Sequence, residues 1–262
     1  MFDVPAVGAP FGPFTLLHEK PFSRTFKNAS CTAFLKEYRG ITPSLRQERE
    51  ASALSEAARL GVVVPEVLGA GETSDTAWTL LRHVAGRVGA VAPQNDLSSF
   101  VEQVAALGQL LHAPTLHTQP GPGWTPSADD TRTNHEHMMG GFSPHARTEP
   151  WWEDVDAAVG ATDLGPVVYL HGDLKPEHFI CSNHHVAVVD WEACARGSAY
   201  CDQTDALFHA LRDLLLLETS LHQIPHNLFD RLQVPGPVMA HRVLLWLDRR
   251  PPRRPADTGT RP

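Results

Sequence analysis

The chain has 262 residues, of which 42% are hydrophobic and 20% are charged, and its formal net charge is −8. This composition is too apolar for a disordered chain, and the length suffices for one large domain or two lobes. The acidic balance gives no electrostatic reason to expect a nucleic acid or an anionic membrane as the partner. We therefore expect a soluble protein that binds a small molecule or a peptide.

Cysteine spacing and the N-terminal residues bear on the compartment. The four cysteines show no C-x-x-C spacing, which indicates free thiols in a reducing cytosol. The start of the chain has no basic segment and contains three prolines within residues 1–17, so it does not read as a signal peptide. The most apolar run, at residues 214–218, is too short to span a bilayer. These features predict a cytoplasmic protein.

The first third of the chain predicts a small antiparallel sheet with one helix. Short alternating runs predict strands at residues 14–19, twice within 24–39, and at 62–72 and 76–84. Apolar and small residues recur at helical spacing over residues 44–61, and Gly61 is a typical helix stop. The predicted order is three strands, one helix and two strands.

The remainder is mostly helical. Helices are predicted at residues 96–113, 151–160, 200–224 and 234–250, and short apolar runs at 166–174 and 185–192. The polar stretch at 114–150 is rich in Pro and Gly and predicts a long loop. Residues 250–262 are basic and Pro-rich, which indicates a disordered tail. We therefore expect an N-terminal lobe at 1–84, a C-terminal lobe at 85–249, and a cleft between them.

Two carboxylates follow the two apolar runs. Asp173 and Asp190 each come at the end of such a run, and a tight turn separates the runs, so adjacent strand ends are expected to hold both side chains at one edge of a cleft. Such a pair suits glycoside hydrolysis, an aspartic-protease dyad, or phosphoryl transfer in which one Asp orients a hydroxyl and the other holds Mg²⁺. Two aspartates that merely cap strand ends are the structural alternative.

The residues around the pair resemble a known family. The stretches "HGDLKPEHF" (171–179) and "VVDWE" (188–192) resemble the catalytic and metal loops of aminoglycoside phosphotransferase-like and choline-kinase-type enzymes. The resemblance covers residues 14–215 in order. It implies an α+β, protein-kinase-like fold, with a small antiparallel-sheet N-lobe that carries one helix and a mostly helical C-lobe.

The resemblance also implies roles for the loop residues. Asp173 is expected to orient the acceptor hydroxyl or accept its proton, and His171 to brace the loop. Lys175 is placed where it could contact the γ-phosphate. Asp190 is expected to ligate Mg²⁺. His178 stands where the family usually has Asn, so it is expected to ligate the metal beside Asp190 or to hydrogen-bond to Asp173. Since imidazole suits softer metals than Mg²⁺, Mn²⁺ is an alternative ion.

The predicted N-lobe supplies the nucleotide contacts that the resemblance implies. Lys36 is expected to hold the phosphates and to pair with Glu50 or Glu48, and the backbone at Arg82, His83 and Val84 to bind adenine. The loop expected to cover the phosphates, "HEKPFSRTF" (18–26), contains no glycine. Side chains would have to replace the backbone N–H groups of a glycine-rich loop there, and the candidates are Ser23, Arg24 and Thr25.

These expectations lead to one reading and two alternatives. The reading is an ATP- or GTP-dependent phosphotransferase that acts on a hydroxyl of an antibiotic-like small molecule. The first alternative is a kinase of Ser or Thr in a natural-product precursor peptide of the lanthipeptide or thioamitide type. The second is a non-catalytic, pseudokinase-like module that binds a partner protein in a complex.

Overall fold

The structure is a computed structural model, and it describes residues 11–89, 95–112, 131–183, 185–216 and 231–249. The predicted disordered tail at 250–262 and the part of the polar stretch at 114–130 lie outside the described residues. Within the described ranges, no helix combines the length and the apolar character needed to cross a membrane.

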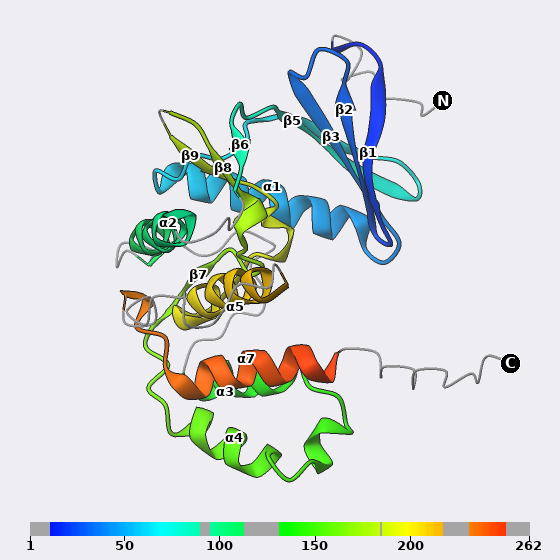
Figure 1. Cartoon of the computed structure of the whole chain (residues 1–262). Coiled ribbons are helices and arrows are strands. Elements are labelled where there is room, and N and C mark those ends of the chain that lie inside the picture. Colours follow the sequence, from blue (N-terminus) through cyan, green and yellow to red (C-terminus); the bar gives the residue numbers. More distant parts are fainter. Residues whose placement is uncertain (1–10, 90–94, 113–130, 184, 217–230, 250–262) are drawn as a thin grey trace, which may run out of the picture.

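A five-stranded antiparallel sheet forms one end of the molecule (Figure 1). Its strands are β1 (Phe14–Lys20), β2 (Ser23–Asn28), β3 (Ala33–Arg39), β4 (Val67–Glu72) and β5 (Thr76–Arg82), in the order β1-β2-β3-β5-β4. Alternate residues of these strands, Phe26, Leu35, Trp78 and Leu80, form a small core on one face. The predicted strands and their order along the chain are confirmed.

The helix α1 (Pro43–Arg59) connects this sheet to the rest of the molecule. Proline in its first turn starts the helix, and Gly61, with φ +88°, follows its end, as predicted. Its buried residues Ala53, Leu54 and Ala57 pack in one core with α2 (Asn95–Leu111) and α5 (Tyr200–Leu216), not in the core of the sheet. The lobe boundary at residue 84 stays a prediction, because α1 shares the central core.

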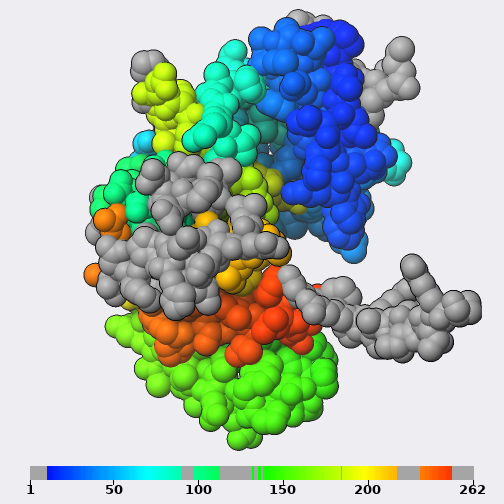
Figure 2. Space-filling view, viewed as in Figure 1, coloured from blue at the N-terminus to red at the C-terminus, as the bar shows by residue number. Residues whose placement is uncertain are grey.

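A second group of helices lies at the other end of the molecule (Figure 2). It comprises α3 (Thr131–Met139), η2 (Ala146–Thr148), α4 (Trp152–Gly160) and α7 (Gly236–Asp248). The prediction of a loop throughout 114–150 was wrong for α3 and η2. Met138 and Met139 of α3 are buried in one cluster with Val159 and Val238, and this packing stabilises a helix that its polar sequence alone does not indicate.

Two small sheets flank the loops that carry the aspartates. β7 (Val167–Leu170) pairs with β10 (Ala195–Ser198), whereas β6 (Arg87–Val88), β8 (Phe179–Cys181) and β9 (Val186–Val188) form a separate sheet. The expected hairpin between the apolar runs is present as β8–β9. The expectation that adjacent strand ends hold the two carboxylates was wrong, because β7 and β9 belong to different sheets. The loop after β7 and the short helix η3 (Pro176–His178) bring the carboxylates together instead.

Candidate active site

The buried carboxylate of Asp202 holds the loop after β7 in place. The backbone N–H groups of His171 and Gly172 donate to the two oxygens of Asp202, at 2.6 Å and 2.8 Å. Burial raises the pKa of Asp202 to about 7, and these two hydrogen bonds oppose that rise. Asp202 comes from the first turn of α5, so the helix and the loop are fixed to each other.

His171 is fully buried beneath the loop. Its Nδ1 accepts the backbone N–H of Asp173 at 3.3 Å, and its Nε2 donates to the carbonyl of Val189 at 2.9 Å. Burial is the main cause that lowers the pKa of His171 to about 4, and the neighbouring His178 lowers it further. A neutral ring is also what both hydrogen bonds require. His171 therefore positions Asp173 and joins the two loops, as expected from the sequence.

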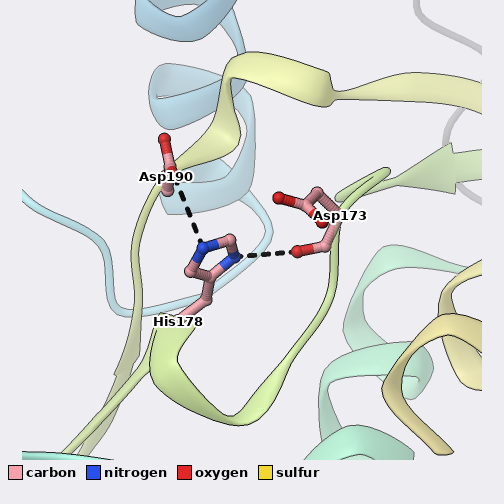
Figure 3. A group of neighbouring side chains, drawn as sticks. All are labelled: Asp173, His178 and Asp190. Carbon is pink, nitrogen blue, oxygen red and sulfur yellow. Dashed lines mark hydrogen bonds and ion pairs between the residues drawn. The ribbon is translucent and has the colours of Figure 1, made fainter. Parts of the chain in front are cut away.

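His178 lies between the two aspartates (Figure 3). Its Nδ1 donates to the backbone carbonyl of Asp173 at 2.8 Å, and its Nε2 lies 3.4 Å from Oδ2 of Asp190. Nδ1 carries the proton in that hydrogen bond, so Nε2 is the ring nitrogen that faces Asp190. His178 is thus oriented to share a ligand with Asp190.

Asp190 has a left-handed backbone, with φ +65°. Asp and Asn adopt this region more readily than other residues with a side chain. Burial alone would raise the pKa of Asp190, but Lys36 and then His178 outweigh it and hold the pKa well below its usual range. Asp190 is therefore a carboxylate at any physiological pH.

Lys36 is the buried cation of the site. Its Nζ lies 2.6 Å from Asp190, 2.7 Å from Glu50 and 3.1 Å from Glu192. Burial would lower the pKa of Lys36, but Glu50 and Asp190 hold it well above its usual value. Tyr38 donates to Glu50 at 2.5 Å and fixes that carboxylate. Of the two candidates, the structure brings Glu50 to Lys36.

Three cavities adjoin along the site. The first has a volume of about 330 Å³, the second about 400 Å³ and the third about 730 Å³. Asp190 lines the first and the second, and Asp173 lines the second and the third. The first and third cavities share no described lining residue. Asp190 therefore lies where the first and second cavities meet, and Asp173 lies where the second and third cavities meet.

Most of the predicted nucleotide residues line the first cavity. Apolar side chains form much of its wall, among them Phe34, Leu81, Val88 and Ile180. The predicted residues in its lining are Ser23, Thr25, Lys36, Glu50, Arg82, His83, Val84, His178 and Asp190. The structure thus gathers residues that lie up to 167 positions apart in the chain, from Ser23 to Asp190, around one apolar space.

Arg24 is the exception among them, because it lines none of the three cavities. Its Nε donates to Glu19 at 3.0 Å, and its guanidinium lies 3.6 Å from Glu37. Successive residues of a strand point to opposite faces, so Arg24 points away from the face on which Ser23 and Thr25 meet the cavity. A phosphate clamp by Arg24 has no support in this geometry.

Lys175 pairs with the first aspartate. Its Nζ lies 2.9 Å from Oδ2 of Asp173 and 3.8 Å from Glu177. Burial would lower the pKa of Lys175, but the hydrogen bond and the charge of Asp173 raise it. The lysine stays a cation beside Asp173.

Three further residues belong to the site, and the sequence reading assigned them no role. Lys20 lies 3.4 Å from Asp190. Glu192, two residues after Asp190, contacts Lys36 and forms an ion pair with Arg46 of α1. The sequence shows Glu192 as an acidic residue close to Asp190. Its partners Lys36 and Arg46 lie 146 residues or more away in the chain, so no local pattern identifies them.

The donor set at the middle of the site fits a divalent cation. Ligand atoms of Asp173, His178 and Asp190 lie within 4.8 Å of one another. Two carboxylates and one imidazole are common ligands of Mn²⁺ and are acceptable for Mg²⁺, which prefers oxygen. Asp190 with His178 is the pair that would hold the ion, because the ring of His178 is oriented for it.

The fold and the site together define a class of protein. A small antiparallel sheet with one helix, a mostly helical remainder, and a Lys36–Glu50 pair whose lysine contacts Asp190 are the features of a kinase-like phosphotransferase. The model of the phosphotransferase enzyme family matches residues 22–222, so the chain belongs to that family. The predicted family, fold class and enzyme class are confirmed.

Solved structures with this fold support the assignment. Aminoglycoside phosphotransferase APH(3'')-Id from Streptomyces rimosus is 16% identical, with 94% of this chain and 98% of that chain covered and a TM-score of 0.66. Macrolide 2'-phosphotransferase MphH from Brachybacterium faecium is 17% identical, with 92% and 86% covered and a TM-score of 0.58. At such identities the likeness shows the fold. A comparison with curated protein sequences gives no match.

Proposed function

We propose that this phosphotransferase moves the γ-phosphoryl group of ATP or GTP to a hydroxyl of a small-molecule acceptor. One observation carries the proposal: Asp190 and Asp173 stand at successive junctions of three adjoining cavities, and Lys36, which lines the first cavity, contacts Asp190. A nucleotide in the first cavity and an acceptor in the third would meet at the second. Two solved aminoglycoside phosphotransferases with this fold bind ADP with streptomycin and GDP with kanamycin, respectively.

The first cavity suits a nucleoside. Its apolar side chains offer faces for a purine ring, and the chain at Arg82, His83 and Val84 lines the same space, where we expect it to recognise the edge of the base. Lys36, which also lines this cavity, is a buried cation that can hold phosphate oxygens, and Glu50 keeps it in place. We therefore propose that the base lies beside Arg82, His83 and Val84 and the phosphates beside Lys36.

The second cavity suits the transfer itself. The carboxylate of Asp173 can orient the acceptor hydroxyl and take its proton, and Lys175 beside it can neutralise charge on the transferring group. A divalent ion held by Asp190 and His178 would supply charge neutralisation for the phosphates. Catalysis then consists mainly of positioning and electrostatic stabilisation by residues that are already held in place.

The third cavity suits an acceptor with few positive charges. Each carboxylate in its described lining has a cation beside it: Glu136 pairs with Arg132, Asp173 with Lys175, and Asp205 with Arg242. Arg249 adds a further cation to the lining, and Met138, Val238 and Leu245 add apolar surface. A polycationic acceptor gains most from unpaired carboxylates, so we favour a neutral or acidic hydroxyl compound over an aminoglycoside.

Transfer from labelled nucleotide tests the proposal. The purified chain is incubated with [γ-³²P]ATP or GTP, Mg²⁺ or Mn²⁺, and three acceptor sets: aminoglycosides, neutral or acidic hydroxyl compounds such as uncharged polyols and hydroxy acids, and Ser/Thr peptides. Label on the second set, lost in Asp173→Asn, is the expected result. Label on peptides alone would favour the precursor-peptide kinase.

Nucleotide binding separates an enzyme from a scaffold. ATP or GTP with a divalent ion should raise the melting temperature, because a ligand that binds only the folded state stabilises it. Absence of any shift, together with absence of label on every acceptor, would overturn the proposal and favour a non-catalytic module.

A further inference from the structure

Lysine is rare in this chain and concentrated at the site. The sequence contains four lysines against 18 arginines: Lys20, Lys27, Lys36 and Lys175. Three of the four form ion pairs with Asp173 or Asp190. Lys36 and Lys175 have the roles described above. Lys20 is the third, and neither the proposed reaction nor the family likeness has given it one.

Lys20 occupies a particular oxygen of Asp190. Its Nζ lies 3.4 Å from Oδ2, the same oxygen that lies 3.4 Å from Nε2 of His178. Lys36 holds the other oxygen, Oδ1, at 2.6 Å. Lys20 therefore covers the side of the carboxylate that faces the candidate metal ligand His178.

Lys20 differs from Lys36 in its freedom to move. The side chain of Lys20 is 49% exposed, whereas that of Lys36 is 9% exposed and surrounded by three carboxylates. Lys20 also lines both the first and the second cavity. An exposed ion pair contributes little to stability, so its ammonium group can exchange one partner for another at small cost.

The backbone around Lys20 is fixed. The carbonyl of Phe22 accepts the backbone N–H of Arg39 at 2.9 Å and Nη1 of Arg46 at 2.7 Å. The guanidinium of Arg46 also lies 5.7 Å from the centre of the Phe22 ring. The turn between β1 and β2 is thus anchored to β3 and α1, and movement of Lys20 is confined to its side chain.

The same turn is poorly suited to bind phosphate through its backbone. A glycine-rich loop offers several N–H groups that approach phosphate closely. Here Pro21 has no N–H, and no glycine stands between Phe14 and Tyr38. Positive charge at this position must come from a side chain, and Lys20 is the cation of the turn that lines the first two cavities.

We propose that Lys20 binds the terminal phosphates of the nucleotide in place of a glycine-rich loop. In the free protein its ammonium group rests on Oδ2 of Asp190. Terminal phosphates carry more negative charge than one carboxylate, so the ammonium group moves to them when the nucleotide enters. Oδ2 and His178 are then exposed together to a divalent ion. The inference rests on the proposed function, since it needs a nucleotide in the first cavity.

Two effects of opposite sign follow from removal of Lys20. The affinity for nucleotide should fall, because a charge-assisted contact to phosphate is lost. The affinity for a divalent ion alone should rise, because no ammonium group competes for Oδ2. A merely structural lysine would produce neither pattern.

Calorimetric titration of Lys20→Gln tests both effects, with Lys27→Gln as the matched control. Lys27 lies at the far end of β2 and lines none of the three cavities. The ligands are ATP, adenosine, and Mn²⁺ alone. For Lys20→Gln we expect ATP to bind about tenfold more weakly, adenosine to bind as in the wild type, and Mn²⁺ alone to bind more tightly. Lys27→Gln should match the wild type throughout, and circular dichroism confirms that each variant is folded.

Several results would overturn the inference. ATP affinity of Lys20→Gln within about twofold of the wild type would remove the phosphate role, as would an equal loss for adenosine. Unchanged Mn²⁺ affinity would show that Lys20 does not compete with a divalent ion for Oδ2 of Asp190. Failure of the wild type itself to bind ATP and GTP would instead reject the proposed function, and the role of Lys20 with it.

Discussion

A β-carbon on Gly172 would lie 2.0 Å from the carbonyl oxygen of Ala193. Gly172 is also in the left-handed region, with φ +84°, where residues with a side chain are strained. The loop after β7 therefore passes against the backbone just beyond Asp190, at a distance that only glycine permits. This contact fixes the relative position of the two aspartates.

Substitution of Gly172 by Ala should lower the free energy of unfolding for two separable reasons. Gly165 has a similar φ of +67°, but a β-carbon there meets no atom within 4 Å. Gly165→Ala should therefore cost only backbone strain, about 1 kcal/mol. Gly172→Ala adds the collision with Ala193 and should cost about 3 kcal/mol or more. Urea denaturation of both variants measures the difference, and equal losses would contradict the close approach.

Replacement of Asp173 by Asn should abolish transfer without loss of nucleotide binding. The amide keeps the size of the side chain but cannot accept the hydroxyl proton, so kcat should fall about 10²- to 10⁴-fold. Nucleotide-dependent stabilisation should persist, because Asp173 lines the second and third cavities and not the first. Asp154→Asn, an exposed carboxylate on α4, is the control and should leave kcat unchanged. Retained activity in Asp173→Asn would remove Asp173 from the chemistry.

Lys36 and Glu50 should show strong coupling in a double-mutant cycle. Lys36→Met leaves Glu50, Asp190 and Glu192 without their shared cation and should cost about 3–5 kcal/mol of unfolding free energy. Glu50→Gln relieves part of that excess negative charge. The double variant should therefore lose less than the sum of the single variants, by about 1 kcal/mol or more. Additive losses would mean that the pair acts independently.

His178→Asn should shift the metal preference toward Mg²⁺. Imidazole favours softer ions than an amide oxygen does, so the ratio of Mn²⁺- to Mg²⁺-supported activity should fall in the variant. The cost in stability is expected to be modest, about 1–2 kcal/mol, from the lost hydrogen bond to the Asp173 carbonyl and the smaller buried side chain. An unchanged ratio would restrict His178 to bracing the loop.

His209 should make the protein less stable in acid. Burial, Arg212 and Arg242 lower the pKa of His209 to about 3, and its Nε2 accepts a hydrogen bond from Arg242 at 3.3 Å. Because the unfolded chain binds a proton near pH 6.5 and the folded chain does not, this stability is fully present above pH 6.5 and is lost as the pH falls toward 3. Allowing for partial solvent access, the effect is about 2 kcal/mol.

The control for this pH dependence is His145, whose side chain is 82% exposed. Unfolding free energies measured between pH 7 and pH 4 should fall less steeply in His209→Gln than in the wild type. His145→Gln should retain the wild-type slope. Parallel slopes for all three proteins would show that His209 is not responsible.

The proximity of the residues at the centre of the candidate site was predictable because they are close in the sequence. Asp173, His178 and Asp190 lie within one stretch of 18 residues, and a short loop, a single helical turn and a hairpin are enough to bring them together. The Lys36–Glu50 pair was also predictable, since a strand followed directly by a helix brings positions 14 residues apart into contact.

The rest depends on packing that no local pattern shows. The contact between Lys20 and Asp190 joins residues 170 positions apart, and the ion pair of Arg46 with Glu192 joins residues 146 apart. The sequence did not predict helix α3, because the helix is stabilised by packing of its own Met138 and Met139 against residues that are distant in the chain, such as Val238. Arg24 could have been excluded, since the alternation of β2 already assigns it to the face opposite Ser23.

The first and the third cavity are built from separate parts of the chain. The first cavity is formed by strands of the N-terminal sheet and by the β8–β9 hairpin, whereas helices α3, α5 and α7 supply most of the third. Under the proposed function, substitutions in those helices would alter which alcohol is accepted while the phosphate donor is bound as before. Acceptor choice and donor binding could then change independently, with Asp173 at the boundary between them.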